Sequence, residues 1–153
     1  MVSRTLLACL GAAAVFVAEP VAATERISGP VTAVVTRALD GDTLEVNVHL
    51  WIGLVLNVHV RIRGIDTPET HQPQCASEKA MGMEATKKLI ALAGSQVVLA
   101  DIENDKYGGR VDAKVTAADG TDIGTAMIET GLAHPYDGTG QRADWCAVGS
   151  IRK

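Results

Sequence analysis

The segment RIRGIDTPET, residues Arg61–Thr70, ends a long strand-like pattern and begins an acidic turn. Pro68 lacks a backbone N–H and has a fixed φ, so a strand ladder must stop there. Asp66 and Glu69 place two carboxylates three residues apart at this break. Hard oxygen ligands favour Ca²⁺ or Mg²⁺ over a soft metal, and the guanidinium of Arg61 suits a phosphate. The segment therefore predicts a cation site beside a phosphate-binding arginine, with a surface ion pair in a polar turn as the alternative.

Before this break, apolar and polar residues alternate along two arms of the chain. The apolar positions are Leu44, Val46, Val48 and Leu50 in the first arm, and Leu54, Leu56, Val58, Val60 and Ile62 in the second. A period of two is typical of half-buried strands, and a bend near residues 51–53 joins the arms. The pattern predicts a long, half-buried hairpin with an apolar face and with Arg61 on its polar face.

The remaining segments predict three further strands and two helices. The strands are Val31–Arg37, Gln96–Ile102 and Arg110–Ala117; the helices are Glu78–Ala93, with Ser77 as N-cap and Gly94 as stop, and Ile123–Thr130, ended by Gly131. Residues Leu132–Lys153 are rich in Gly, Pro and Asp and predict an irregular tail. Five short strands with a helix after the third favour an α+β fold, a closed five-stranded OB-fold barrel whose open face binds oligonucleotides.

The first 23 residues have the pattern of a signal peptide. Met1–Arg4 is positively charged, Leu6–Ala18 is apolar, and Val21–Ala23 supplies small residues for cleavage. The apolar run is shorter than the about 20 residues of a membrane span, and a lipoprotein site at Cys9 is the weaker alternative. We therefore expect residues 24–153 to form one domain that is exported to a periplasm or secreted, monomeric and without membrane attachment after cleavage.

The net charge restricts how the chain can bind nucleic acid, and the cysteine count predicts a disulfide. The whole chain has a formal net charge of −4, and removing residues 1–23 takes away one acidic and one basic residue. An acidic domain is unsuited to wrapping nucleic acid non-specifically, which needs a basic surface. Cys75 and Cys146 remain after cleavage, and an even count in an oxidising compartment favours a disulfide between them. A metal site is the alternative, although no CxxC spacing exists.

Four motifs in order resemble the staphylococcal nuclease (thermonuclease) family, across about Val31–Tyr136. They are DGDT at Asp40–Thr43, RIRGIDTPE at Arg61–Glu69, DKYGGR at Asp105–Arg110, and ADG with ETGLA within Ala118–Ala133. The resemblance implies a calcium-dependent, sugar-non-specific endonuclease that hydrolyses phosphodiester bonds of DNA and RNA.

The resemblance also implies a role for individual residues. Asp42, Asp66 and the carbonyl of Thr67 match the calcium ligands, Glu69 matches the general base, and Arg61 and Arg110 match the phosphate-binding arginines. Tyr107 either stacks on a base or supports its turn, and Tyr136 is the candidate nucleotide contact.

Three features depart from the family pattern. An extra glycine precedes Arg110, only Tyr136 stands where the family has two tyrosines, and the chain ends shortly after Cys146 instead of continuing into a long basic helix. Arg142 is therefore the rival of Arg110 as a phosphate ligand. The departures keep a second hypothesis open, a non-catalytic OB-fold module that binds single-stranded nucleic acid or another ligand.

Overall fold

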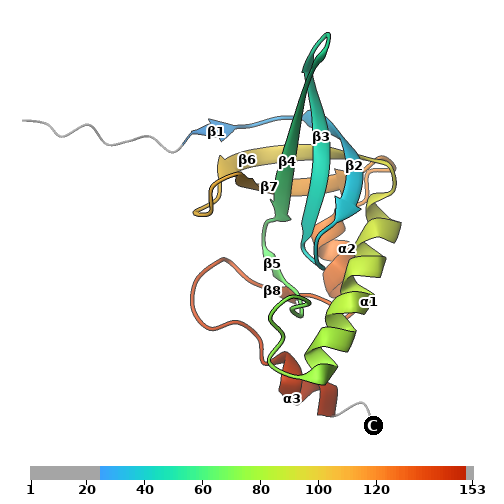
Figure 1. Ribbon diagram of the computed structural model, residues 1–153, viewed down its shortest axis with the longest axis vertical. Helices are drawn as coiled ribbons and strands as arrows, with labels where there is room; N and C mark the ends of the chain where they lie inside the picture. Colours follow the sequence, from blue (N-terminus) through green and yellow to red (C-terminus); the bar gives the residue numbers. More distant parts are fainter. Residues whose placement is uncertain (1–24, 151–153) are drawn as a thin grey trace, which may run out of the picture.

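The computed structural model describes residues 25–150 (Figure 1), so the predicted signal peptide lies outside the described residues. Five strands form the main sheet: β2 (Val31–Ala38), β3 (Thr43–Trp51), β4 (Leu54–Ile62), β6 (Gln96–Asn104) and β7 (Arg110–Ala117). Each predicted strand is thus present, with ends that move by at most a few residues. A short strand, β1 (Arg26–Ile27), pairs with β6 and was not predicted.

The five strands close into a barrel. Strand β3 pairs with β2 and β4, β4 pairs in parallel with β7, and β6 pairs with both β7 and β2. The ladder therefore returns to its first strand, and the helix α1 (Ala76–Ala93) enters the chain between β4 and β6. This α+β architecture confirms the predicted OB-fold.

Helix α1 begins earlier than the sequence predicted. Its N-cap is Cys75, whose Sγ accepts a hydrogen bond from the backbone N–H of Glu78 at 3.4 Å. Ser77, the predicted N-cap, lies inside the helix. Serine is favoured over cysteine at an N-cap in general, but here the fold places the cysteine sulfur at the helix end. Gly94 stops the helix as predicted.

The C-terminal tail is more ordered than predicted. Helix α2 (Ile123–Glu129) is followed by β8 (His134–Pro135), which pairs with β5 (Ile65–Asp66), and by α3 (Trp145–Ser150). A disulfide joins Cys75 to Cys146, as predicted. It fastens the start of α3 to the start of α1, across 71 residues of sequence. The tail is therefore held near the segment that follows β5.

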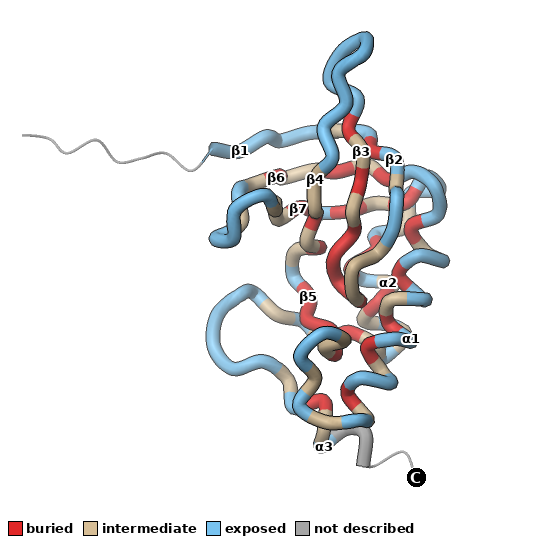
Figure 2. The backbone as a smooth tube through the Cα atoms, viewed as in Figure 1, coloured by how far each residue is buried: buried red, intermediate tan, exposed pale blue. Residues whose placement is uncertain are grey.

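The core lies inside the barrel and beneath α1. Leu44, Val46, Val60 and Ile62 of the predicted apolar face are at most 1% exposed, and Leu89 of α1 packs in the same cluster. The upper part of the hairpin differs, since it is exposed on the outside of the barrel (Figure 2). The prediction of one continuous half-buried face is therefore wrong beyond Val48. Among the described helices, none is long and apolar enough to cross a membrane.

Candidate active site

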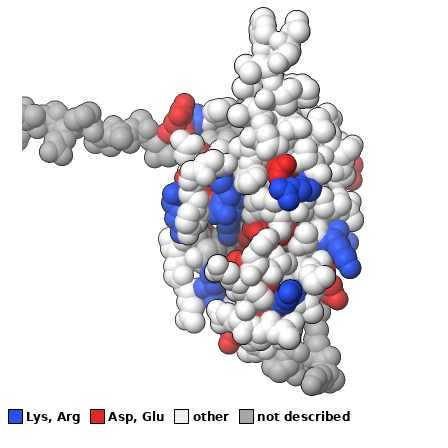
Figure 3. All heavy atoms as spheres, in the orientation of Figure 1, with Lys and Arg blue, Asp and Glu red and all other residues white. Residues whose placement is uncertain are grey.

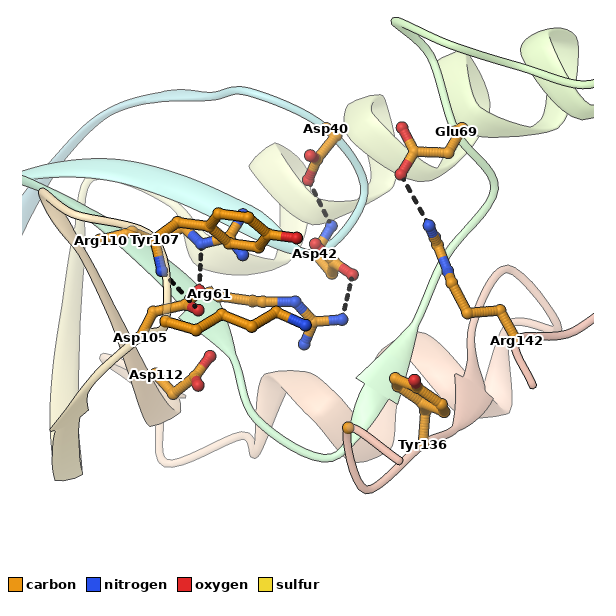
Figure 4. Close-up of a pocket in the computed structure, with 12 residues that line it drawn as sticks. Asp40, Asp42, Arg61, Glu69, Asp105, Tyr107, Arg110, Asp112, Tyr136 and Arg142 are labelled. Atoms are coloured by element: carbon orange, nitrogen blue, oxygen red, sulfur yellow. Dashed lines mark hydrogen bonds and ion pairs between the residues drawn. The ribbon is translucent and has the colours of Figure 1, made fainter. Parts of the chain in front are cut away.

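Side chains from separate parts of the fold line one open cleft of about 490 Å³ (Figure 4). They come from the β2–β3 turn, from β4, from the segment after β5, from the β6–β7 turn, from the start of β7 and from the tail. The residues that carry its chemistry are Asp40, Asp42, Arg61, Glu69, Asp105, Tyr107, Arg110, Asp112, Tyr136 and Arg142. Carboxylates and guanidiniums alternate around this cleft, so it suits an anion together with a cation.

The β2–β3 turn brings Asp42 to the floor of the cleft because Gly41 allows a close approach. A Cβ on Gly41 would lie 2.6 Å from the side chain of Ala85 and 2.8 Å from that of Thr67. Glycine is therefore required where the turn packs against α1. The turn is also fixed by a hydrogen bond of 3.1 Å from the backbone N–H of Asp42 to the carboxylate of Asp40.

Asp42 is a buried carboxylate that is only partly neutralised. Arg61 contacts its Oδ2 at 3.2 Å, and the hydroxyl of Thr43 donates to its Oδ1 at 2.9 Å. Burial and the nearby charge of Asp40 nevertheless raise the pKa of Asp42 to about 7, against the lowering effect of Arg61 and Thr43. Further positive charge near Asp42 would stabilise its ionised form.

Arg110 is held in place from two sides. Its Nε donates to the carboxylate of Asp105, and its guanidinium carbon lies 4.9 Å from the centre of the Tyr107 ring. Burial tends to raise the pKa of Asp105, but the hydrogen bond from Arg110 and those from the turn backbone lower it below its usual value. The Gly108–Gly109 pair has not moved Arg110 out of the cleft. Tyr107 therefore supports the arginine and remains half exposed.

Arg142 makes the most extensive contacts of any residue in the cleft. Its Nε donates to Asp66 Oδ1 at 2.5 Å, one terminal nitrogen to Glu69 Oε1 at 3.0 Å, and the other to the carbonyl of Thr67 at 3.1 Å. Burial lowers the pKa of Arg142, but the hydrogen bond to Glu69 and the charge of Asp66 raise it well above its ordinary value. One guanidinium thus binds three of the residues predicted as metal ligands or base.

Trp145 completes the environment of Asp66. Its indole Nε1 donates to Asp66 Oδ2 at 3.2 Å, and its ring stacks on His134 with centroids 4.4 Å apart. Trp145 and Asp66 are both buried. Since the disulfide of Cys146 adjoins Trp145, the covalent link helps to keep this contact in place.

The oxygens of Asp42, Asp66 and Thr67 are chemically suited to a hard cation. Asp42 supports this fit, because it is buried and Arg61 neutralises it only in part. The hydrogen bonds that Arg142 already donates to Asp66 and Thr67 oppose the fit unless Arg142 moves. Among the described residues, one group of three His, Cys, Asp or Glu ligand atoms lies within 4.8 Å: Cys75, Glu78 and Cys146. Its cysteines form the disulfide, so it is no metal site.

The structure places the predicted site residues in two groups. Arg61, Glu69, Tyr107, Arg110, Tyr136 and Asp42 line the cleft, whereas Asp66 and the carbonyl of Thr67 lie buried behind Arg142. The sequence predicted Arg142 only as a rival phosphate ligand, and it did not predict Asp40, Asp105, Asp112 or Trp145 as part of the site. Partial burial of Asp112, together with the charge of Asp105, raises the pKa of its carboxylate.

An OB-fold barrel with arginines and carboxylates in one open cleft defines a protein class that handles nucleic acids and phosphate esters. A family model described as "Staphylococcal nuclease homologue" matches residues 59–145, more than half of the chain, and the chain belongs to this family. The match spans Arg61, Glu69, Arg110 and Arg142 but begins after Asp42. No curated protein matches the chain. Membership indicates a hydrolytic, nuclease-type function that acts on nucleic acid.

Proposed function

We propose that the protein is a calcium-dependent endonuclease that hydrolyses phosphodiester bonds in DNA and RNA without sugar specificity. The observation that carries the proposal is the convergence of Arg61, Arg110 and Glu69 on the cleft that also contains Asp42. Two guanidiniums and one carboxylate are the groups that a phosphoryl-transfer site needs for charge stabilisation and for the attacking water.

Arg61 and Arg110 bind the scissile phosphate in this proposal. Their guanidiniums are anchored by Asp42 and Asp105 respectively, so they are already oriented before substrate arrives. The pentacoordinate transition state carries more negative charge than the ground state, and preorganised donors stabilise it selectively. Tyr107 keeps Arg110 in position from its other face, and Tyr136 contacts the nucleotide from the tail side of the cleft.

Glu69 acts as the general base that orients or deprotonates the attacking water. Its carboxylate is about one-third exposed at the cleft and is held by Arg142 at 3.0 Å. Arg142 contacts Oε1 of Glu69, and the exposed part of the carboxylate remains open to the attacking water. The position of Arg142 beside the cleft also allows it to contact a phosphate.

Asp42, Asp66 and the carbonyl of Thr67 are the residues that would hold Ca²⁺. A cation bound there supplies positive charge next to the phosphate and neutralises the buried carboxylates. Asp66 and the carbonyl of Thr67 already accept hydrogen bonds from Arg142. The guanidinium must therefore leave these oxygens before they can bind the cation. Calcium binding is thus linked to movement of the tail residue Arg142.

The second candidate is a non-catalytic module that holds single-stranded nucleic acid. The contacts of Arg142 favour it, because they occupy Asp66, Thr67 and Glu69 together. In such a module these contacts are permanent, and Arg61 and Arg110 alone bind the phosphate backbone. This alternative predicts binding that neither requires calcium nor ends in cleavage.

The deciding experiment incubates residues 24–153 with single-stranded DNA, double-stranded DNA and RNA, first with Ca²⁺ and then with excess chelator. We expect internal cleavage of all three with Ca²⁺ and none with chelator. An Arg61→Ala variant should lose cleavage. Arg63→Ala should retain it, because Arg63 pairs with Glu103 and does not line the cleft. If the native protein binds single-stranded DNA or RNA without cutting it, both with Ca²⁺ and with chelator, the result would favour the binding module instead.

A further inference from the structure

The outer end of the β3–β4 hairpin stands clear of the barrel (Figure 1). Strand β2 pairs with β3 only as far as Val48, and β7 pairs with β4 only from His59 onward. Between these limits the two strands pair with each other, at His49 with Val55 and at Trp51 with Leu54. Residues 49–55 therefore form a two-stranded ribbon that projects from the domain, and Leu56 adjoins its base.

This ribbon carries large apolar side chains that are exposed. Its apolar tip consists of Leu50, Trp51, Ile52, Leu54, Val55 and Leu56, which are 45–93% exposed, with Ile52 the highest. Because successive strand residues point to opposite faces, Val55 and its neighbours Leu54 and Leu56 make both faces of the ribbon apolar. An exposed apolar patch of this size marks an interaction surface in soluble proteins.

The chemistry of the apolar tip excludes nucleic acid as its ligand. Residues 46–60 contain no Asp, Glu, Lys or Arg, and His49 and His59 are their only titratable side chains. The end of the hairpin is accordingly free of charged atoms on the face shown in Figure 3. Nucleic acids are bound through Lys and Arg contacts to phosphate. The tip is therefore a surface separate from the cleft.

We propose that the apolar tip inserts into the interfacial region of a lipid bilayer. A flat protein surface would cover one face of the ribbon and leave the apolar side chains of the other face in water. A bilayer instead surrounds the ribbon from both sides. Trp51, which is 77% exposed near the turn, is the residue type enriched at membrane interfaces.

The backbone of the ribbon limits how deep it enters. Beyond Val48 and before His59 the outer edges of both strands lack a neighbouring strand among the described residues. Unpaired backbone groups are too costly in the hydrocarbon core, so the tip lies at the headgroup–acyl boundary. Binding is also independent of anionic lipid, because no cation lies on the tip to attract it. The proposal does not depend on catalysis in the cleft.

The test uses residues 24–153, because the apolar run Leu6–Ala18 would bind lipid itself. Protein is floated with vesicles of phosphatidylcholine, alone or with one-quarter phosphatidylglycerol, in low and high salt. We expect flotation with both kinds of vesicle at both salt concentrations. Trp51 fluorescence should shift to the blue, whereas Trp145 is already buried and should not respond. A Trp51→Phe variant should lose the shift and retain most of the flotation.

A matched pair of variants separates the tip from general surface hydrophobicity. Trp51→Ser with Ile52→Ser should reduce flotation by at least about tenfold, while Met83→Ser with Ile90→Ser, which removes exposed apolar residues from α1, should not. Both pairs should keep the native thermal transition, since neither includes a core residue. Absence of flotation of the native chain, or equal loss in both variants, would overturn the proposal. A dimer that the tip substitutions dissolve would also overturn it, in favour of a second copy as the occupant.

Discussion

Arg142 determines how the candidate site can bind a cation. Its guanidinium donates to the oxygens of Asp66 and Thr67 that would hold a calcium ion in the proposed function, and to Oε1 of Glu69. A guanidinium and a divalent cation both neutralise carboxylates, so the two compete for the same oxygens. In the proposed function, this competition would couple the tail of the chain to calcium binding.

Arg142→Ala should therefore strengthen calcium binding. Hydrogen bonds to charged groups contribute about 1.5–3 kcal/mol, and their loss from the calcium-free protein should lower the Kd for Ca²⁺ by about tenfold or more. Isothermal titration calorimetry measures this directly. Arg63→Ala is the matched control, because Arg63 pairs with Glu103 instead. Weaker calcium binding by the Arg142 variant would show that the guanidinium supports the cation site and does not compete with it.

Arg110→Ala should lower kcat far more than it raises KM. Its guanidinium is oriented by Asp105 and Tyr107 before substrate binds, and loss of one preorganised donor to transition-state charge costs about 10²–10³-fold. Steady-state cleavage of a labelled oligonucleotide gives both constants. A purely higher KM would contradict this assignment and would reduce Arg110 to a ground-state phosphate contact.

At this scale the sequence predicted some of the cleft residues that lie within its motifs, but not Asp40 or Asp105. Asp42, Arg61 and Arg110 are each marked by a short local pattern, and the barrel brings them together as expected. The contacts of Arg142 were not predictable in this way, because they join residues 73–76 positions apart. They depend on where the tail folds back, which no local pattern in the tail encodes.

At the scale of elements, the disulfide connects α1, which the sequence predicted, to α3, which it did not predict. Helix α1 has a clear composition and a glycine stop, whereas α3 is one short helix within a tail that is rich in turn residues. Tertiary contacts stabilise α3: Trp145 is buried against His134 and Asp66, and Cys146 is bonded to Cys75. Propensity alone could not predict it, since short helices gain most of their stability from packing.

Replacement of both cysteines by alanine should destabilise the domain by roughly 4 kcal/mol, the chain-entropy value for a crosslink that closes so long a loop. The tail should loosen first, because Cys146 adjoins Trp145. Urea denaturation gives the free energy of unfolding, and Trp145 fluorescence reports the tail. A Cys9→Ala control in the full-length chain leaves the Cys75–Cys146 pair intact. A double variant with unchanged stability would contradict a structural role for the bond.

The β3–β4 hairpin shows why the sequence predicted the strands correctly but not which of their side chains are buried. Alternation correctly predicted both strands, but the same pattern continues past Val48, where the barrel no longer covers it. Periodicity records which side chains share a face of a strand. It does not record how far the neighbouring strands reach. The exposed apolar tip therefore became evident only from the strand pairings.

At the scale of the whole molecule, the disulfide and the N-terminal pattern support the same location. Structural disulfides persist in oxidising compartments, and residues 1–23 have the composition of a cleaved signal. We propose that the protein is exported and acts as a monomer outside the cytoplasm. The net charge of −4 gives the chain no overall attraction for polyanions, so the proposal assigns substrate binding to the cleft arginines.

Expression of the full-length chain in a bacterium should therefore yield a periplasmic product that begins at Thr24. Intact mass and N-terminal sequencing identify the cleavage site, and alkylation without reductant should find no free thiol. Size-exclusion chromatography with light scattering should give the mass of one chain. An uncleaved cytoplasmic product with two reactive thiols would contradict the proposed export.

In the proposed function, Glu69 is the general base for phosphodiester hydrolysis, and Glu69→Gln is the sharpest test of that role. The substitution keeps the size of the side chain and removes its basicity. Single-turnover cleavage of a labelled single-stranded DNA in saturating Ca²⁺ should slow by at least about 10²-fold, while the Kd for the same DNA changes little. Cleavage at the native rate by the variant would contradict the account.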